Sequence, residues 1–304
     1  PKNFEKLIDE KTRCIYAETL PNPYLRVFPI KEVSDIGRKH NVPLIMDNTA
    51  APVICKPLDH GAAVVIHSLT KFIGGHGTVI GGCLVDGGNF DWTADPKRQP
   101  LFNEPDASYG GAVWGQVVPQ LTGANVAFAV RARVCLLRDL GAPLAPDNAW
   151  GIIQGLETAP LRMKQHCSNA EKVVDFLTKH KSVERVIYPT LHKGAVADRA
   201  KKYFKGGNGA LVGIEVKGGV EAGKKFIEAL KMFYHVANIG DARSLAIHPA
   251  TTTHSQLNEE ELLAAGVTPG YVRLSIGIEH PDDIIADLEQ ALGASGKPSL
   301  KAVS

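Results

Sequence analysis

Two short apolar runs early in the chain end in polar side chains that a buried strand rarely carries. Residues 42–46 (Val-Pro-Leu-Ile-Met) lead into Asp47, and residues 62–66 (Ala-Ala-Val-Val-Ile) lead toward Ser68 and Lys71. Short runs of this kind, rich in β-branched residues, predict buried strands. Because ligands in open α/β sheets bind at the carboxyl ends of the strands, the sequence predicts a site where Asp47, Ser68 and Lys71 meet.

Strand and helix patterns alternate through the first half of the chain. We expect strands at residues 12–18, 42–46, 62–66 and 79–85, and a helix at residues 30–40. Such alternation indicates a parallel sheet covered by helices. The segment from Gly87 to Gly123 is instead rich in proline, glycine and aromatic residues, and we interpret it as a loop-rich lining near the active site.

The second half of the chain predicts a smaller α+β domain. A helical pattern at residues 148–156 resumes at 163–177, as a helix linking two domains would. We then expect strands at residues 183–188, 210–216 and 272–278, helices at 220–232 and 281–292, and a frayed tail at 293–304. We therefore divide the chain into a large domain at residues 1–157 and a small domain at residues 158–304.

Composition limits the possible classes of function. The chain has 304 residues, of which 44% are hydrophobic and 22% charged, so it can bury a full core. A net charge of +2 gives no reason to expect a nucleic-acid or membrane partner, and no apolar run approaches the ~20 residues that span a bilayer. The first residues do not resemble a secretory signal. The five cysteines are widely spaced and include no Cys-x-x-Cys pair, which predicts reduced thiols in a cytoplasmic protein.

Lys71 lies in a segment that reads His67-Ser-Leu-Thr-Lys-Phe-Ile-Gly-Gly-His-Gly77. A surface lysine in a turn is the plainest interpretation. A nucleotide-binding P-loop is excluded, because its glycines precede the lysine and a hydroxyl residue follows, whereas here Phe72 follows. Residues 75–81 also lack the dinucleotide fingerprint, because Ile80 occupies the position of the third glycine.

Asp47 changes the interpretation of Lys71. A carboxylate at the end of a buried strand is costly to desolvate unless a cation faces it, and a protonated pyridine nitrogen would be such a cation. Pyridoxal 5'-phosphate requires a lysine for covalent attachment, an acidic residue beside its ring nitrogen and donors for its phosphate. Lys71, Asp47 and the hydroxyls of Ser68 and Thr70 supply these groups, so we predict this cofactor with Lys71 as the catalytic residue.

The pattern Ser68-x-Thr70-Lys71-(aromatic)-x-x-Gly-His resembles that of the pyridoxal-phosphate enzymes of cysteine and methionine metabolism. The resemblance continues through residues 18–23 (Glu-Thr-Leu-Pro-Asn-Pro), 47–49 (Asp-Asn-Thr), 244–249 (Ser-Leu-Ala-Ile-His-Pro) and 272–277 (Val-Arg-Leu-Ser-Ile-Gly), and so covers nearly the whole chain. It implies an α/β protein with the type I fold of pyridoxal-phosphate-dependent transferases, which is aspartate-aminotransferase-like. In that fold, a large domain with a mostly parallel sheet is followed by a smaller α+β C-terminal domain.

Within this family, residues 66–71, 86–92 and 237–241 are most similar to the members that act on O-acetylhomoserine. The resemblance implies a γ-replacement transferase that joins this amino acid to sulfide or methanethiol and yields homocysteine or methionine, and acetate. Lys71 would be the mobile base, because the pKa of a lysine falls readily on burial or beside another cation. A C–S lyase of the same family, such as a methionine γ-lyase, would share the same residues and remains an alternative.

Three further residues receive roles from the resemblance. Asn22 follows a predicted strand, where it is a plain turn residue or, as in the family, a partner of the cofactor's phenolic oxygen. Arg273 interrupts an apolar run, where it forms an internal ion pair or, as in the family, binds the substrate α-carboxylate with its planar fork. Ser244 would lie close to the same carboxylate.

The family's N-terminal arm and first strands are not matched in this chain. They hold the aromatic residue that stacks on the cofactor, a glycine turn that binds its phosphate and groups that reach a neighbouring subunit. We therefore expect residues 1–157 to be the remainder of the large domain, with the missing part absent or on a separate N-terminal chain. A non-catalytic remnant or subunit is thus a further hypothesis.

Partners and metals complete the expectations. The resemblance implies a homotetramer with active sites at a dimer interface, acting on a small amino acid and on sulfide or a thiol. His76, His248 and His254 invite a metal interpretation, but none pairs at helical i, i+4 spacing with an acidic residue, so we expect no metal site.

Overall fold

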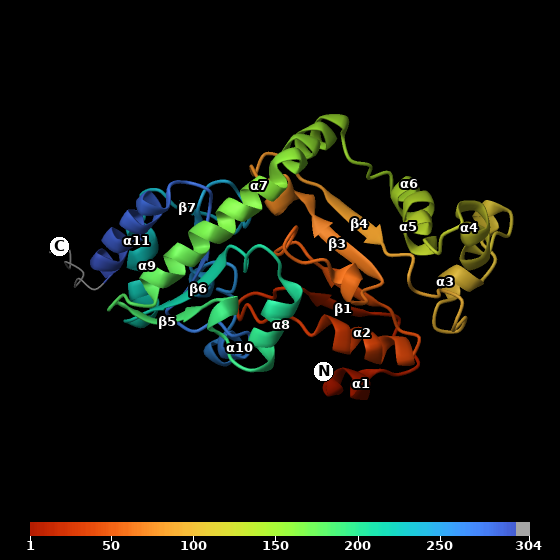
Figure 1. The fold of residues 1–304 in the computed structure, drawn as a ribbon, viewed down its shortest axis with the longest axis horizontal. Coiled ribbons are helices and arrows are strands. Elements are labelled where there is room, and N and C mark those ends of the chain that lie inside the picture. Colours follow the sequence, from red (N-terminus) through yellow and green to blue (C-terminus); the bar gives the residue numbers. More distant parts are fainter. Residues whose placement is uncertain (296–304) are drawn as a thin grey trace.

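The computed structural model describes residues 1–295, which form two sheets with one long helix passing beside both (Figure 1). The strands are β1 (Ile15–Glu18), β2 (Leu44–Asp47), β3 (Val64–Ser68), β4 (Gly82–Asp86), β5 (Val183–Ile187), β6 (Leu211–Val216), β7 (Tyr234–His235), β8 (Leu245–Ile247) and β9 (Tyr271–Ser275). The α-helices are α1 (Lys2–Leu7), α2 (Ile30–Lys39), α3 (Pro100–Asn103), α4 (Trp114–Thr122), α5 (Ala127–Arg131), α6 (Arg138–Leu140), α7 (Pro146–Leu177), α8 (Ala195–Tyr203), α9 (Gly219–Ala229), α10 (Glu259–Ala264) and α11 (Pro281–Ser295). All strands and helices predicted from the sequence pattern are present, with their ends shifted.

The first sheet has the strand order β1-β2-β3-β4. The first three strands are parallel and β4 runs antiparallel to β3, so the prediction of a mostly parallel sheet is confirmed. In the register of these strands, Glu18 is opposite Asp47 and Asp47 is opposite Ile66. The carboxyl ends of β1, β2 and β3 therefore meet at one edge of the sheet, where polar residues follow each strand.

The beginning of β1 is displaced from the prediction by a turn. Asp9 Oδ1 accepts hydrogen bonds from the backbone N–H groups of Lys11 (3.0 Å) and Thr12 (2.8 Å). These bonds hold the backbone in an Asx-type turn, which competes with a strand. The strand consequently begins at Ile15 rather than at Thr12.

Helix α2 covers one face of the first sheet. Its buried residues Ile30 and Val33 belong to the same core cluster as Leu44 and Met46 of β2. Full burial of an aliphatic side chain of this size contributes roughly 1.5–3 kcal/mol. The apolar stripe of α2 thus fixes the helix against one face of β2, and Asp47 lies on the opposite face together with Ile45, which is buried in a separate cluster.

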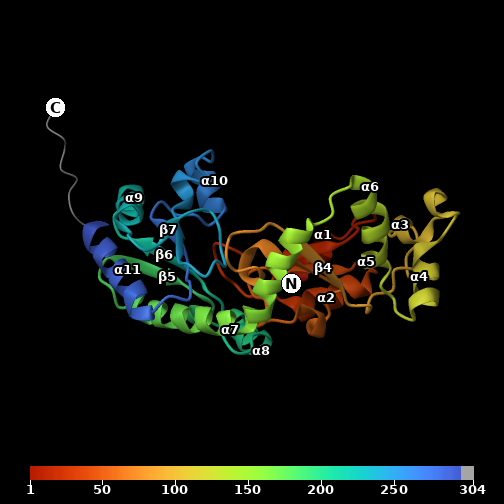
Figure 2. The same ribbon diagram turned by 90° about the horizontal axis from the view of Figure 1, so that it is seen from above.

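The second sheet has the strand order β5-β6-β9-β8-β7 and is antiparallel except for the pair β7 and β8. Helices α7, α9 and α11 pack against it around a separate core cluster, and Figure 2 shows α9 and α11 at the end of the molecule opposite α3 and α4. Arg273 occupies the middle of β9, opposite Gly213 of β6 and Ile247 of β8. Arg273 therefore lies on an inner strand of this sheet, between β6 and β8.

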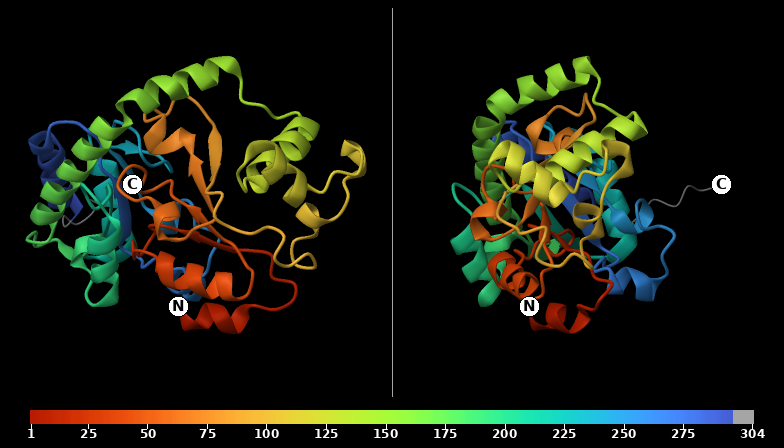
Figure 3. Two further views of the ribbon diagram at one scale, coloured as in Figure 1. Left: turned by 45° about the vertical axis from the view of Figure 1, so that its right-hand side comes forward. Right: turned by 90° about the vertical axis from the view of Figure 1, so that its right-hand side faces the viewer.

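Helix α7 connects the two halves of the chain. It packs against the turn that follows β3 as well as against β5, β6 and α11 (Figure 3). The two helical segments expected at residues 148–156 and 163–177 are thus parts of one continuous helix. The division at residues 157 and 158 stays a prediction, and it falls inside α7.

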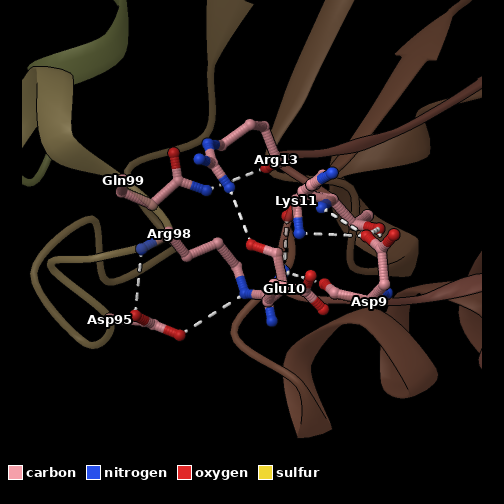
Figure 4. A network of polar contacts seen from close by, with 8 residues as sticks. Asp9, Glu10, Lys11, Arg13, Asp95, Arg98 and Gln99 are labelled. Atoms are coloured by element: carbon pink, nitrogen blue, oxygen red, sulfur yellow. Dashed lines mark hydrogen bonds and ion pairs between the residues drawn. The ribbon is translucent and has the colours of Figure 1, made fainter.

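The segment from Gly87 to Gly123 does not line the Lys71 region, and this corrects the prediction. Because β4 is antiparallel to β3, the chain leaves β4 at the amino ends of the parallel strands. There the Gln99 side chain donates a hydrogen bond to the Arg13 carbonyl (2.8 Å), next to the amino end of β1 (Figure 4). The aromatic residues of the segment pack with one another, as Trp92 does with Phe102 at 4.7 Å between ring centroids.

Helix α11 closes the described part of the chain. It extends past its predicted end to Ser295, whose hydroxyl donates to the Leu292 carbonyl (2.8 Å). Residues 293–295, which we expected in a frayed tail, are therefore helical. Residues 296–304 of that predicted tail lie outside the described residues.

Candidate active site

Lys71 is carried by a single π-helical turn, Leu69–Ile73, which directly follows β3. Within the turn the Lys71 backbone departs from helical geometry, with φ −88° and ψ −131°. The Thr70 hydroxyl accepts a hydrogen bond from the Gly81 N–H (3.1 Å) and lies 3.3 Å from the Gly81 carbonyl, which ties the turn to the segment before β4. Isolated π-turns and unusual backbone angles are frequent at functional sites.

A cavity of about 240 Å³ opens at the carboxyl edge of the first sheet. The residues that line it are Glu18, Asp47, Thr49, Ala50, Ser68, Lys71 and Ile239. The structure thus brings together Lys71, Asp47 and Ser68, three of the residues predicted for the site. They come from the ends of β2 and β3, as the sheet topology requires.

Asp47 has neutral hydrogen-bond donors and no cationic partner in the part of the chain that the structure describes. Its Oδ1 accepts from the Thr49 backbone N–H (2.8 Å), and its Oδ2 accepts from the Tyr16 hydroxyl (3.1 Å). Glu18 lies on the neighbouring strand, and its pKa is raised by burial and by the negative charge of Asp47. Two carboxyl groups at one edge of a cavity favour a cationic ligand there.

Lys71 reaches from the first half of the chain to the second. Its ammonium donates a hydrogen bond to the side-chain oxygen of Asn238. Burial lowers the pKa of Lys71, and the nearby positive charge of Arg273 lowers it further. A lysine with a lowered pKa is more readily present as the neutral amine, which is the form that acts as nucleophile and base.

Arg273 has no carboxylate partner among the described residues. Its guanidinium donates a hydrogen bond to the Asn238 backbone carbonyl (3.2 Å), and burial lowers its pKa. The internal ion pair that was one of the two interpretations of Arg273 is therefore not present among the described side chains. A half-buried guanidinium with donors to spare beside Lys71 is suited to bind an anionic ligand.

Thr70 and Asn22, two of the predicted cofactor-binding residues, lie outside the cavity lining. The Thr70 hydroxyl is engaged with the Gly81 backbone, as described above. Asn22 Oδ1 lies 3.4 Å from the hydroxyl of Tyr271, a fully buried residue of β9. In this arrangement the Thr70 hydroxyl holds the turn Leu69–Ile73, here called the lysine turn, against the Gly81 backbone. The role of Asn22 toward a cofactor stays a prediction.

Ser244 is held within the protein, and its predicted role near a substrate carboxylate stays a prediction. Ser244 is fully buried, and its hydroxyl donates to Glu279 Oε2 (3.0 Å) and accepts from the Gly277 N–H (2.9 Å). Its backbone N–H donates to the other Glu279 oxygen (2.6 Å). The Ser244 side chain therefore joins the loop before β8 to the segment after β9, and its hydrogen-bonding groups are used within the protein.

Sequence reasoning missed Asn238 and Glu18 as parts of the site. Asn238 lies in a short segment, residues 237–241, that the sequence marks only by its resemblance to the family. The approach of that segment to Lys71 depends on how the two sheets pack, so no local pattern indicates it. Glu18 could have been found, because it ends a predicted strand next to the strand that ends in Asp47.

Two negative findings apply to the described part of the chain. No group of three or more His, Cys, Asp or Glu among the side chains that the structure describes is arranged to hold a metal ion. None of the helices in the same residues is both long enough and apolar enough to cross a membrane.

The site residues fit pyridoxal phosphate. Lys71, whose pKa is lowered, Asp47, which has no cationic partner among the described residues, and Ser68 line the same cavity. None of the described residues that line the cavity is aromatic, so a ring stacked on the cofactor is not among them. Fold and site together define an α/β protein with a lysine-centred cofactor site.

The family is shown directly by comparison with known proteins. The chain belongs to the Cys/Met metabolism PLP-dependent enzymes, a family that matches residues 1–293. It is 53% identical over 298 residues to the O-acetyl-L-homoserine sulfhydrylase of Leptospira meyeri and 44% identical over 294 residues to the homocysteine synthase of Schizosaccharomyces pombe. Each alignment covers 96% of this chain and 67% of the relative.

A solved structure confirms the fold. The protein from Campylobacter jejuni, described as an O-acetylhomoserine (thiol)-lyase, contains N'-pyridoxyl-lysine-5'-monophosphate. It superimposes with a TM-score of 0.87 at 42% sequence identity, over 96% of this chain and 68% of that one. The predicted α/β architecture of fold type I is therefore confirmed.

Proposed function

We propose that the protein is a γ-replacement transferase that converts O-acetylhomoserine and sulfide to homocysteine and acetate, or uses methanethiol to form methionine. The observation that carries this proposal is the cavity that joins the Lys71 amine to the Asp47 carboxylate, with Arg273 close enough to lower the pKa of Lys71. The names of the relatives described above support the choice of substrate.

Three side chains of this chain would hold the cofactor. Lys71 would hold its aldehyde carbon, Asp47 would pair with its protonated ring nitrogen and the Ser68 hydroxyl would donate to its phosphate. When bound, pyridoxal phosphate supplies an electron sink for the electrons left at Cα of the amino acid. Asn22 keeps its proposed place near the phenolic oxygen, whereas Thr70 acts through the backbone of the lysine turn.

Arg273 would bind the substrate. Its planar guanidinium offers parallel N–H donors that match the two oxygens of an α-carboxylate. Because no carboxylate of the described residues occupies it, a substrate would not have to displace an internal partner. Binding at Arg273 orients the amino acid so that Cα lies within reach of the Lys71 amine.

Lys71 would move the protons. As a neutral amine it removes the proton from Cα, and a second deprotonation at Cβ prepares the loss of acetate from Cγ. The sulfur nucleophile then forms a new bond to the same carbon, and the protons return to Cα and Cβ. The lowered pKa of Lys71 favours the basic form in which these transfers begin.

An assay with and without a thiol separates the transferase from the lyase alternative. Purified protein with pyridoxal phosphate is given O-acetylhomoserine and sulfide, and homocysteine and 2-oxobutanoate are both measured. We expect homocysteine to depend on sulfide and little 2-oxobutanoate to form. Rapid release of 2-oxobutanoate from methionine in the absence of a thiol would contradict the transferase assignment and favour the lyase.

The hypothesis of a non-catalytic remnant has its own test. The chain is mixed with pyridoxal phosphate, reduced with borohydride and digested, and the modified lysine is identified by mass spectrometry. We expect modification at Lys71 and none at this position in Lys71→Ala. If the unsubstituted chain is not modified at Lys71, the remnant hypothesis is the better one.

We also propose that the protein works in the cytoplasm as a homotetramer whose active sites lie near a subunit interface. In support, the first half of α7 exposes a row of large apolar side chains, Trp150 (68%), Ile153 (53%) and Leu156 (53%). Such a row on one face of a helix is typical of an interaction surface. Sedimentation equilibrium tests the assembly, and Trp150→Glu should weaken it.

A further inference from the structure

Arg162 is a buried cation in the middle of α7 that interacts almost entirely with backbone carbonyls. Its side chain donates to the carbonyls of Phe72 (2.6 Å), Ile73 (2.8 Å) and Gly155 (2.6 Å), and its Nε donates to the Thr158 hydroxyl (3.1 Å). It forms no ion pair with any side chain that the structure describes, and it is 5% exposed. Burial lowers its pKa.

Two of these carbonyls belong to the turn that carries Lys71. The last carbonyls of a short helical turn have no partner within the turn, and a buried carbonyl without a donor is costly. Arg162 supplies charge-assisted donors to Phe72 and Ile73, the two residues directly after Lys71. No other described side chain donates a hydrogen bond to either carbonyl.

The fit around the guanidinium is close. A Cβ atom at Gly75 would overlap the Arg162 guanidinium, and a Cβ atom at Gly155 would overlap the carbonyls of Ile73 and Gly74. The helix and the lysine turn are therefore in contact through glycines on both sides. A shorter side chain at position 162 could not reach the same carbonyls without moving the turn.

We infer that Arg162 is a positioning residue for Lys71, because its guanidinium fixes the two carbonyls after Lys71 and so sets the direction in which the lysine amine enters the cavity. This inference rests on the proposed function in that Lys71 is the reactive group. Arg162 of α7, which is remote from Lys71 in sequence, would thus determine the environment of the Lys71 amine. None of the hydrogen bonds of Arg162 is to a residue that lines the cavity.

The consequence is measurable at the Lys71 amine. The amine faces the Asn238 side chain and the charge of Arg273, and it shares its cavity with the carboxyl groups of Glu18 and Asp47. If the turn relaxes, Lys71 becomes more hydrated and moves away from Arg273. Both changes favour the ammonium, so the pKa of Lys71 should rise toward the ordinary lysine value.

The test is competitive acetylation of the ligand-free chain with acetic anhydride over a range of pH, read at each lysine by mass spectrometry. In the unsubstituted chain, Lys71 should react with a midpoint below that of the exposed lysines. We expect Arg162→Met to raise that midpoint by about 1 pH unit, since the charged form gains hydration, and Arg162→Lys to raise it by less. Acetylation requires no cofactor, so this result is independent of the pyridoxal phosphate test, in which failure of the proposed function would appear.

Arg199→Met is the matched control. Arg199 is another largely covered arginine, which pairs with Glu32 at 3.7 Å between α8 and α2, and its loss should lower stability without moving the Lys71 midpoint. The inference is overturned if Arg162→Met folds, as judged by circular dichroism, and leaves the Lys71 midpoint unchanged. If Arg162→Met does not fold, the same measurement is made on Arg162→Lys. A raised pH midpoint for Lys71 acetylation then supports the inference, and an unchanged midpoint overturns it.

Discussion

Lys71 donates a hydrogen bond to Asn238, a residue 167 positions further along the chain. The backbone carbonyl of the same asparagine accepts a hydrogen bond from Arg273 (3.2 Å). One residue thus contacts both the proposed base and the proposed carboxylate-binding group. The reactive end of the first sheet and the arginine of the second sheet are thereby held in one network.

The first prediction concerns the charge beside Lys71. Asn238→Asp places a carboxylate where the amide oxygen accepts a hydrogen bond from Lys71, which favours the ammonium and raises the pKa of Lys71. We expect the pH midpoint of lysine modification by pyridoxal phosphate to move upward by about 1 unit or more. As a control, Asn208→Asp adds the same charge at a residue that contacts Glu171 and should leave the midpoint in place. An unchanged midpoint in Asn238→Asp would mean that the two side chains do not interact in solution.

The second prediction concerns substrate binding by Arg273. Arg273→Leu removes the guanidinium, and loss of one partner of a buried charge pair costs about 2 kcal/mol or more, equivalent to roughly a 30-fold increase in KM for the amino acid. Arg273→Lys should recover part of this loss, because it restores the charge but not the planar fork. Steady-state kinetics and thermal unfolding are measured together. A large fall in stability with an unchanged KM would instead indicate a structural role.

The third prediction distinguishes Ser244 from a substrate-binding residue. Ser244→Ala leaves the Gly277 N–H and Glu279 Oε2 without the hydroxyl that bonds them, which should lower the free energy of unfolding by about 1–3 kcal/mol. The KM for the amino acid should change little. Urea unfolding and kinetics on the same preparation check both statements, and a raised KM at unchanged stability would instead support a substrate-binding role for Ser244.

The fourth prediction concerns acid stability and His166, a fully buried residue of α7. Its Nδ1 lies 2.7 Å from the Ile276 carbonyl and its ring packs edge-on against Phe72 at 5.3 Å, so a neutral ring donates there. Its pKa is lowered to about 4, mainly by burial and also by the charge of Arg162, while the Ile276 carbonyl and Asp241 oppose the shift.

The sign of the effect follows from proton binding. Between the unfolded value near 6.5 and the folded value of about 4, the unfolded chain binds more protons at this position, so stability falls as the pH falls. The full loss amounts to about 3 kcal/mol below pH 4. Urea unfolding from pH 7 to pH 4 should show this slope, and His166→Phe should reduce it. An equal slope in both proteins would show that other groups cause the acid sensitivity.

The sequence by itself determined the strands, the alternation with helices and the place of Lys71 and Asp47. These depend on short apolar runs and on the polar residues that directly follow them, and in a parallel sheet consecutive strands deliver their ends to one edge. Arg273 was also visible, because a cation in an apolar run is locally unusual. The local sequence pattern was sufficient to predict features that depend on residues adjacent to one another in the chain.

The tertiary structure alone decided which polar groups are available at that edge. Thr70 and Ser244 lie in motifs similar to those of the family, yet their hydroxyls are used by Gly81, Gly277 and Glu279. Asn238 approaches Lys71 only because the two sheets pack together, and the antiparallel direction of β4 carries the Gly87–Gly123 segment to the opposite edge. Hydrogen bonds between residues distant in sequence depend on the packing of whole elements, and no pattern within a short window records that packing.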